Sequence, residues 1–240
     1  MTDIDLSLII PSYNESRRIK MSLVTIYEYL SNQKYSYEVI LCDDGSYDST
    51  LSIARDFSQG KSNFHILSLP DKGKGSAVKA GMIAARGKYR FMCDADLAMP
   101  LEQIKLFLTE LKNGCDIAIG SRELIGSNRY EEPKFRYLSG RIFNLFVKVV
   151  ALRKYSDTQC GFKCFSSEAA EKIFPVLKTK GWAFDVEALL LAERHRFLVS
   201  EIPINWYHGE ESKVKFRSAV FQMAKDILFM RIRLFFSTGN

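Results

Sequence analysis

The sequence predicts an α/β fold in which a mostly parallel sheet is flanked by helices, with an amphipathic helix at the C-terminal end. In the first half of the chain, short apolar runs typical of buried strands alternate with segments whose apolar residues recur at helical spacing. Strands and helices that alternate in this way form βαβ units and a parallel sheet covered on both faces. The composition agrees, because 47% of the 240 residues are hydrophobic and 26% are charged, as in globular proteins and unlike disordered or fibrous chains.

Each element of the first half follows from a local pattern. Five apolar runs bounded by turn-forming residues predict strands, the first of which we expect to end at Pro11. These strands are residues 6–10, 38–42, 64–69, 89–93 and 116–119. Helical spacing after the strands predicts two helices that end near residues 30 and 57, and helices over residues 74–85 and 101–112.

The second half breaks this alternation. The charged segment 130–136, which contains Pro133, predicts a mobile loop, and residues 139–152 predict a very apolar helix. The remaining patterns predict strands over residues 162–165 and 198–206 and helices over residues 181–194 and 216–236. The sequence contains no repeat and no linker, so we expect one domain over residues 1–215, followed by the C-terminal helical segment 216–240.

Polar residues follow three of the predicted strands at the point where each strand ends, over residues 11–15, 43–46 and 94–96. In sheets of this kind ligands bind beyond the carboxyl ends of the strands, so we expect these segments to form one site. Asp94 and Asp96 can present oxygens to a hard divalent cation that bridges to the phosphates of a ligand. Such a triplet also occurs by chance in surface loops, but its place at a strand end favours metal and nucleotide.

Two further segments have both a plain and a functional interpretation. Asp43 and Asp44 precede a predicted helix, where one such residue is an ordinary N-cap, but two adjacent carboxylates can accept hydrogen bonds from a ribose or a uracil ring. Residues 72–76 are either the flexible basic start of a helix or a loop that holds phosphate at a helix N-terminus. The sequence has neither a P-loop nor the G-x-G-x-x-G of dinucleotide-binding proteins.

Several classes of protein are excluded by what the sequence lacks. The three histidines share no ligand spacing, and Cys160 and Cys164 lack the two further ligands that a zinc site needs. An odd number of cysteines, five, in a chain without a signal-like start predicts reduced cytosolic thiols. The sequence contains no charge-free apolar run of about 18 residues, so no segment is predicted to span a membrane. The net charge of +6 predicts an anionic partner, but no nucleic-acid-binding motif is recognisable.

The two most apolar helices predict a surface that binds lipid or protein. Over residues 216–236 apolar residues recur at helical spacing and are interrupted by charged residues such as Lys225 and Arg231. A helix of this kind lies in a membrane interface, or it packs on its own domain or on a second subunit. The helix predicted over residues 139–152 is nearly all apolar but carries Arg141 and Lys148, which favours the membrane interpretation.

Eight motifs stand in order along the chain and cover about residues 6–215. They are IIPSYNE (9–15), CDDGSYDST (42–50), GKGSAVKAG (73–81), DADLAMP (94–100), IGSR (119–122), DTQCGFKCF (157–165), GWAFDVE (181–187) and ESK (211–213). In this order they resemble the family 2 glycosyltransferases, specifically the polyprenyl-phosphate hexosyltransferases of the dolichyl-phosphate glucose and mannose synthase type. The resemblance implies a GT-A-type fold and a metal-dependent, inverting transfer of a hexose from a nucleotide-sugar to a polyprenyl or dolichyl monophosphate.

The matching motifs also imply roles for individual residues. The nucleotide-sugar would be bound by Pro11, Tyr13, Glu15, Asp43, Asp44, Lys74, Asp94, Ala95 and Asp96. Within this set, Asp94 and Asp96 would hold Mg²⁺ or Mn²⁺. The acceptor phosphate or the donor diphosphate would be bound by Arg122, Arg141 and Lys213. The catalytic residues would be Asp96, Arg122 and Asp185, of which Asp185 would contact sugar hydroxyls or act as a base towards a neutral hydroxyl.

The donor and the place of the reaction are implied in the same way. Residues 184–187, FDVE, are more similar to the dolichyl-phosphate glucose synthases than to the mannose synthases, which favours UDP-glucose as the donor. GDP-mannose as donor and a glycan hydroxyl as acceptor stay open as alternatives. A lipid acceptor and a chain without a predicted span together imply peripheral attachment to the cytosolic face of a membrane, alone, as a homo-oligomer or with a membrane partner subunit.

Overall fold

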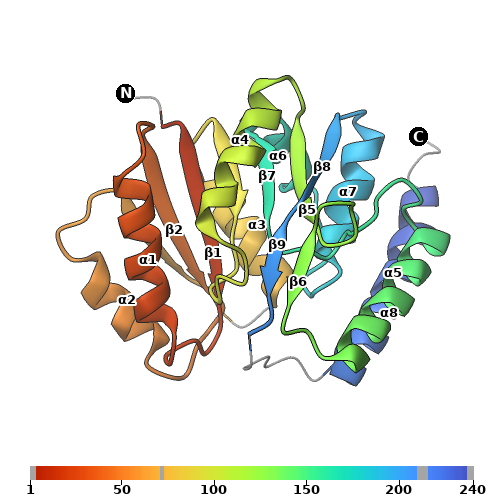
Figure 1. The fold of residues 1–240 in the computed structure, drawn as a ribbon, viewed down its shortest axis with the longest axis horizontal. Coiled ribbons are helices and arrows are strands. Elements are labelled where there is room, and N and C mark those ends of the chain that lie inside the picture. Colours follow the sequence, from red (N-terminus) through yellow and green to blue (C-terminus); the bar gives the residue numbers. More distant parts are fainter. Residues whose placement is uncertain (1–3, 71–72, 210–215, 237–240) are drawn as a thin grey trace.

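The computed structural model describes residues 4–70, 73–209 and 216–236. Its centre is a seven-stranded sheet with the strand order β3-β2-β1-β4-β7-β5-β8 (Figure 1). The strands are β1 (Leu6–Ser12), β2 (Tyr37–Asp43), β3 (Phe64–Ser68), β4 (Tyr89–Met92), β5 (Ile117–Ser121), β7 (Lys163–Ser166) and β8 (Val199–Pro203). Neighbouring strands pair in parallel except β7, which runs antiparallel to both β4 and β5. The predicted mostly parallel sheet is confirmed.

Helices cover both faces of this sheet. They are α1 (Ile19–Ser31), α2 (Thr50–Ser58) and α4 (Ile104–Lys112) on one face, with a 3₁₀ turn at Leu101–Gln103, and α3 (Lys74–Ala84), α6 (Ser167–Ile173) and α7 (Phe184–Arg194) on the other. Alternate residues of β1 enter different cores, because Leu8 and Ile10 pack with the first group and Ile9 with the second. A strand buried on both faces is a continuous apolar run in the sequence, which is the pattern that predicted this strand.

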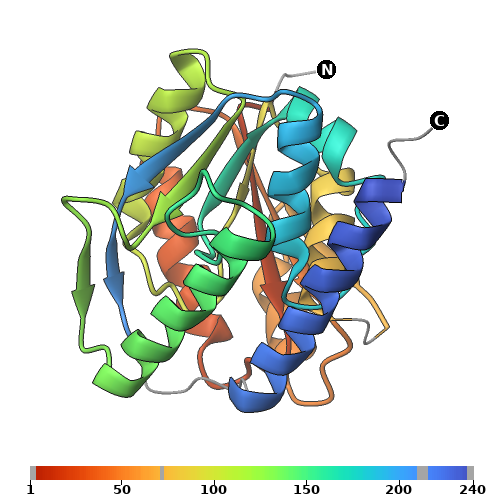
Figure 2. The ribbon, with the colours of Figure 1, turned by 90° about the vertical axis from the view of Figure 1, so that its right-hand side faces the viewer.

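Two long helices complete the fold at one edge of the molecule. α5 (Lys134–Val150) and α8 (Phe216–Phe236) lie side by side, and α8 also packs on α7 (Figures 1 and 2). Both helices bury part of their surface on the domain, α5 through Val147 and α8 through Ile227 and Met230. None of the helices in the described part of the chain combines the length and the apolarity needed to cross a bilayer.

The prediction that the first strand ends at Pro11 is wrong, because β1 continues through Pro11 to Ser12. The carbonyl oxygen of Ile9 accepts a hydrogen bond from the Cys93 amide at 3.0 Å, so Ile9 faces β4. Pro11 lies two residues further on and therefore faces the same side, where β4 has already ended. The amide hydrogen that proline lacks would have had no partner strand there, so the strand tolerates proline at this position.

The prediction of a mobile loop over residues 130–136 is also wrong. The segment begins with the end of β6 (Asn128–Tyr130), which pairs in parallel with β9 (Asn205–Tyr207) outside the main sheet. α5 then starts at Lys134, directly after Pro133, whose φ of −61° is preorganised for entry into a helix.

The last predicted strand, over residues 198–206, is two strands in the structure, β8 and β9. The chain leaves the main sheet after Pro203 because β9 pairs with β6 instead. Sequence patterning also missed α6, a short helix whose N-cap, Ser166, accepts a hydrogen bond from the Ala169 amide at 3.1 Å.

The ring of Phe91 on β4 provides a test of the core. It is fully buried and packs edge-to-face on Phe107 and Phe162, with ring centroids 5.1 Å away in each case. Phe91→Ala should lower the free energy of unfolding by about 3–5 kcal/mol, because it leaves a cavity between two rings. Urea denaturation measures this loss. Leu106→Ala, at an exposed position of α4, is the control and should cost less than about 1 kcal/mol; equal losses would contradict this packing.

Candidate functional site

The loops that follow β1 and β2 are joined to each other at the carboxyl edge of the sheet. The Asn14 amide donates a hydrogen bond to the Ser46 hydroxyl at 2.8 Å, and the Tyr47 amide donates to the side-chain oxygen of Asn14 at 3.0 Å. Asn14 has a φ of 53°, in the left-handed region that asparagine adopts more readily than most residues. Segments 11–15 and 43–46 therefore form one surface, as the sequence predicts.

The two carboxylates at the end of β2 hold this surface in place. Asp43 is buried and accepts hydrogen bonds from the amide and the hydroxyl of Ser46, at 3.0 and 2.5 Å. Asp44, also buried, accepts one from the Gly73 amide at 2.9 Å, which fixes the start of α3. Neither residue caps α2, whose first amide is bound by Asp48 instead. The plain interpretation of Asp43 and Asp44 as N-caps is therefore wrong.

The remaining predicted residues of the first loop occupy different environments. Pro11 is buried within β1, and Glu15 forms an ion pair with Arg18 at 2.7 Å. Tyr13 is 40% exposed and packs edge-to-face on Tyr47, with ring centroids 6.2 Å apart. The two tyrosines form an exposed aromatic rim beside the buried carboxylates.

The loop after β4 brings Asp94 against the start of α3. Lys74 forms an ion pair with Asp94, with 2.6 Å between Nζ and Oδ1, and its ammonium group also lies 5.0 Å from the centre of the Trp182 ring. Gly161 lies on the other side of Asp94, so close that a Cβ atom there would be 2.0 Å from Oδ2. A side chain at this position would displace the Asp94 carboxylate. Ala95 is buried, and its carbonyl ties the loop to the Ser22 hydroxyl of α1 at 2.6 Å.

Charges around this loop act on one another. Burial alone would lower the pKa of Lys74, but the carboxylates of Asp94, Asp185 and Asp96 outweigh it and raise that pKa above its usual value. Desolvation and the charge of Asp94 raise the pKa of Asp96, and a hydrogen bond from the Ala98 amide at 3.1 Å opposes this rise. Asp94 and Asp96 thus repel each other, and a cation placed between them would relieve the repulsion.

These two carboxylates fit a hard divalent cation. Mg²⁺ and Mn²⁺ are commonly held by one or two carboxylates together with the phosphates of a substrate. In the described residues no third acidic, histidine or cysteine side chain joins Asp94 and Asp96 into a larger ligand cluster. A cation bound by Asp94 and Asp96 would therefore take its remaining ligands from a phosphate ligand and from water.

Asp185 stands at the first turn of α7, where it forms a buried ion pair with Lys163 at 2.7 Å. Lys163 also donates a hydrogen bond to the Cys160 carbonyl. Burial raises the pKa of Asp185, while the charges of Lys163 and Lys74 oppose that rise. The structure therefore brings Asp185 within electrostatic reach of Lys74 and Asp94, as a buried, paired carboxylate.

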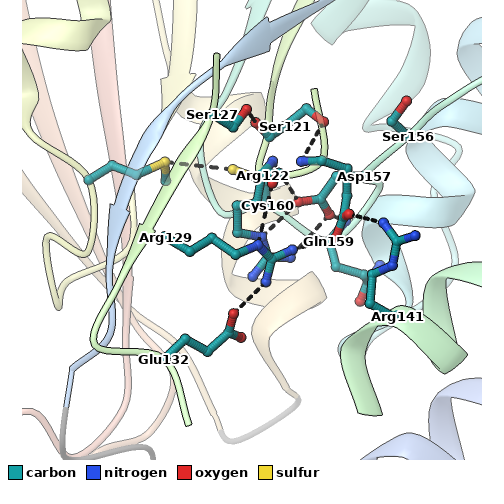
Figure 3. Close-up of polar contacts among 12 residues, drawn as sticks. Ser121, Arg122, Ser127, Arg129, Glu132, Arg141, Ser156, Asp157, Gln159 and Cys160 are labelled. Carbon is teal, nitrogen blue, oxygen red and sulfur yellow. Dashed lines mark hydrogen bonds and ion pairs between the residues drawn. The ribbon is translucent and has the colours of Figure 1, made fainter. Parts of the chain in front are cut away.

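A second group of charges follows β5, and Figure 3 shows how its arginines gather. Arg122 makes a bidentate pair with the fully buried Asp157, at 2.7 and 3.0 Å, and stacks 5.5 Å from the centre of the Trp206 ring. Burial would raise the pKa of Asp157, but the Arg122 guanidinium outweighs it and lowers that pKa to about 2. Arg129 and Arg141 both pair with Glu123. Arg129 also pairs with Glu132 at 2.7 Å.

Sequence reasoning found part of this group. It predicted Arg122 and Arg141, which the structure brings together, and Lys213, which lies outside the described residues. It missed Arg129, Asp157, Gly161 and Lys163. The last three lie in the motif of residues 157–165, so the signal for them was present, whereas nothing in the sequence around Arg129 indicated its role.

The comparisons with known proteins agree with this geometry. The model of the family described as glycosyl transferase family 2 matches residues 7–174. Dolichyl-phosphate beta-glucosyltransferase of Dictyostelium discoideum is 38% identical over 245 residues, which cover 96% of this chain and 75% of the relative. The proteins of the same name from Saccharomyces cerevisiae and Homo sapiens are both 36% identical, over 96% and 95% of this chain and 75% of each relative.

Solved structures agree on the fold. Glucosyl-3-phosphoglycerate synthase of Mycobacterium tuberculosis in complex with UDP superimposes with a TM-score of 0.70 at 17% identity, over 95% of this chain and 80% of that one. The same enzyme with Mn²⁺, UDP-glucose and phosphoglyceric acid has a TM-score of 0.68 at 17% identity, over 95% of this chain and 79% of that one. The predicted GT-A-type fold is confirmed. The family model and the relatives, taken together, show that this chain belongs to glycosyl transferase family 2.

Proposed function

We propose that this chain transfers glucose from UDP-glucose to a dolichyl or related polyprenyl monophosphate at a membrane surface. One observation supports the proposal most directly. Asp94 and Asp96 with Lys74 are suited to a diphosphate, and a separate cluster of arginines is suited to a second anion. Both groups follow strands of the same sheet. The names of the relatives supply the sugar and the lipid. The complexes of the structural neighbour with UDP-glucose support the nucleotide.

The proposed donor site lies along the loops after β1, β2 and β4. The uridine would lie against the rim formed by Tyr13 and Tyr47, near Asp43 and Asp44, and its diphosphate would reach Lys74 at the start of α3. A Mg²⁺ or Mn²⁺ ion held by Asp94 and Asp96 would supply positive charge to the departing diphosphate. Lys74 would add to that charge, because its raised pKa keeps it protonated.

The proposed acceptor site is the arginine cluster. As it stands the cluster is balanced, since Arg122, Arg129 and Arg141 face Asp157, Glu123 and Glu132. Arg141 is the most exposed of the three arginines, with 53% of its side chain accessible. An incoming phosphate monoester would therefore compete with Glu123 for Arg141, with Lys213 as a further proposed cation, while Arg122 stays fixed by Asp157.

Attack by an oxygen of the acceptor phosphate needs little help from a general base. The second pKa of a phosphate monoester is about 6, so its attacking oxygen is already anionic near neutral pH. Attack on the anomeric carbon opposite the leaving diphosphate inverts that centre, and an α-linked donor gives a β-linked product. The buried pair of Asp185 with Lys163 supports a role for Asp185 in positioning Lys74. Positioning and charge neutralisation would then supply the rate enhancement.

Peripheral attachment to the cytosolic face of a membrane is part of the proposal, and the outer face of α5 and α8 supports it. This outer face consists of exposed apolar side chains at helical spacing. They are Phe135, Leu138, Ile142, Leu145 and Val149 of α5 and Phe221, Leu228, Phe229 and Ile232 of α8. Exposed Lys225 and Arg231 border it. Apolar side chains flanked by cations are typical of helices that lie in a membrane interface; a second copy of the chain or a membrane partner subunit is the alternative occupant.

The proposal is tested by incubating the protein with labelled UDP-glucose, dolichyl phosphate and Mn²⁺ or Mg²⁺. Glucose should appear in the lipid fraction, chelation should stop the reaction, and GDP-mannose should be a poor donor. Asp96→Asn should lower kcat by about 100-fold or more, because the cation that would neutralise the leaving diphosphate loses one of its two carboxylate ligands. Asp56→Asn, at an exposed site on α2, is the matched control. No lipid-linked sugar from either nucleotide-sugar would refute the proposal.

The close approach of Gly161 to Asp94 gives a second test. Gly161→Ala should weaken binding of UDP with Mn²⁺ and lower kcat by about 100-fold, because a displacement on the order of 1 Å at a reacting centre has an effect of that size. Calorimetry and initial rates measure the two effects. Gly140→Ala, where an added Cβ has open space, should leave both unchanged. Wild-type binding in the Gly161 variant would show that Asp94 does not need this space.

The outer face of α5 and α8 gives a third test. Replacing Ile142 and Leu145 together by serine should strongly reduce co-sedimentation with anionic vesicles, because two large exposed apolar groups no longer enter the lipid. Turnover of a short, water-soluble polyprenyl phosphate should not change. Light scattering distinguishes the alternative: a wild-type dimer that the double variant dissociates, without a change in vesicle binding, would assign this face to a second copy of the chain.

A further inference from the structure

The segment that joins α6 to α7 packs against the start of α3 and forms a wall there, over residues 175–181. The carbonyl oxygens of Thr179 and Lys180 lie 2.5 and 2.7 Å from where a Cβ would stand on Gly75 and Gly73. The Ser76 amide donates a hydrogen bond to the Lys180 carbonyl at 3.2 Å. The start of α3 carries Lys74, so the position of this wall sets the position of the lysine that pairs with Asp94.

The wall is held from two sides. On one side, Lys79 of α3 donates hydrogen bonds to the carbonyls of Pro175 and Leu177, at 3.0 and 2.8 Å. On the other side, the amides of Lys178 and Thr179 both donate to one oxygen of Glu187, at 3.1 and 2.6 Å. Glu187 is the last residue of the motif over residues 181–187, in which only Asp185 has a proposed role so far.

The other oxygen of Glu187 binds α8. Arg233 reaches it from the last turn of that helix and forms an ion pair with Oε1. The Glu187 side chain is 1% exposed and the Arg233 side chain 35%. One buried carboxylate therefore connects three parts of the molecule. These are α7, which carries it, the wall, and α8, which contributes part of the exposed outer face.

Packing anchors α8 on the domain through Ile227 and Met230, but it does not fill the space between α8 and the wall. A groove of 520 Å³ separates them, lined by residues 178–181 on one side and by Gln222, Asp226, Phe229, Met230 and Arg233 of α8 on the other. A Cβ added to Gly181 would lie 3.8 Å from an oxygen of Asp226, an ordinary van der Waals distance, so the groove narrows at this point. The ion pair between Arg233 and Glu187 is a direct polar link between α8 and the carboxylate that holds the wall.

We propose that Glu187 is a positioning residue which, through Arg233, couples the placement of α8 to the wall behind Lys74 and so to binding of the donor diphosphate. The inference rests on the proposed function for the identity of the donor. Coupling between two sites is reciprocal. Seating α8 on a membrane should tighten binding of the donor, and by this reciprocity binding of the donor should tighten attachment to the membrane by the same factor.

Titration of UDP in the presence of Mn²⁺ tests this, with and without vesicles made of equal parts of phosphatidylcholine and phosphatidylserine. Vesicles should tighten UDP binding to the wild-type protein by about fivefold or more, the lower end of typical coupling. Arg233→Gln should abolish this response and weaken UDP binding, and Arg233→Lys should restore most of both. Glu187→Gln should behave like Arg233→Gln, and the double variant should add little, because both changes remove one interaction.

Arg231→Gln is the matched control, since it removes the same charge from the same helix two residues away, at an exposed position. In the absence of vesicles it should leave the UDP affinity within about twofold of wild type. A purely structural tie predicts a different result, in which the Glu187 and Arg233 variants melt at lower temperature but keep the wild-type UDP affinity and vesicle response. That result would overturn the inference. If Glu187→Gln does not fold, Arg233→Gln alone decides.

The proposed function and this inference fail in different ways. A wild-type protein that binds UDP and forms lipid-linked glucose, while its Arg233 variants respond to vesicles as it does, would leave the function standing and refute the coupling. A wild-type protein that neither binds UDP nor forms lipid-linked glucose would refute both, because the donor on which the coupling acts would be absent.

Discussion

The ion pair between Lys74 and Asp94 connects parts of the molecule that lie far apart along the chain. Two contacts position Lys74. The Gly73 amide donates a hydrogen bond to Asp44 at 2.9 Å, and the backbone of residues 179–180 packs against the start of α3. Asp94 has its position because Gly161 has no side chain. The segments next to strands β2, β4 and β7 and helices α3 and α7 all contact this pair of charges or its neighbours, so their relative placement is constrained by it.

The site uses its buried charges in pairs. Lys163 with Asp185 and Arg122 with Asp157 are each shielded from water and each bonded at 2.7 Å. A buried charge is stable only with a partner, and removing one member of such a pair costs about 3–5 kcal/mol. These pairs are therefore rigid supports. Arg141 is less shielded, with 53% of its side chain exposed, so the arginines of the site divide into buried ones that support it and a more exposed one.

The sequence was sufficient for the features that depend on local pattern. Buried strands with polar ends predicted the sheet and brought residues 11–15, 43–46 and 94–96 to one edge, which the structure confirms. Features that depend on distant partners could not be predicted in this way. The tolerance of β1 for Pro11 depends on where β4 ends, the reversal of β7 depends on its two neighbours, and the pairing of Lys163 with Asp185 joins residues 22 positions apart. Gly161 was visible only as a member of a motif.

Because β7 runs antiparallel to β4 and β5, the loop that it places at the carboxyl edge of the sheet is the one before it. A parallel strand delivers the loop that follows it to the carboxyl edge of the sheet, whereas a reversed strand delivers the loop that precedes it. β7 thereby brings residues 157–161 to the edge already occupied by the loops after β1, β2 and β4. Lys74, Asp94 and Asp96 all come from the first hundred residues, whereas Gly161 and the backbone of residues 179–180, which fix Asp94 and the start of α3, come later in the chain. Since residues 157–161 contact both Asp94, through Gly161, and Arg122, through Asp157, a substitution in this one loop can alter both groups of charges together.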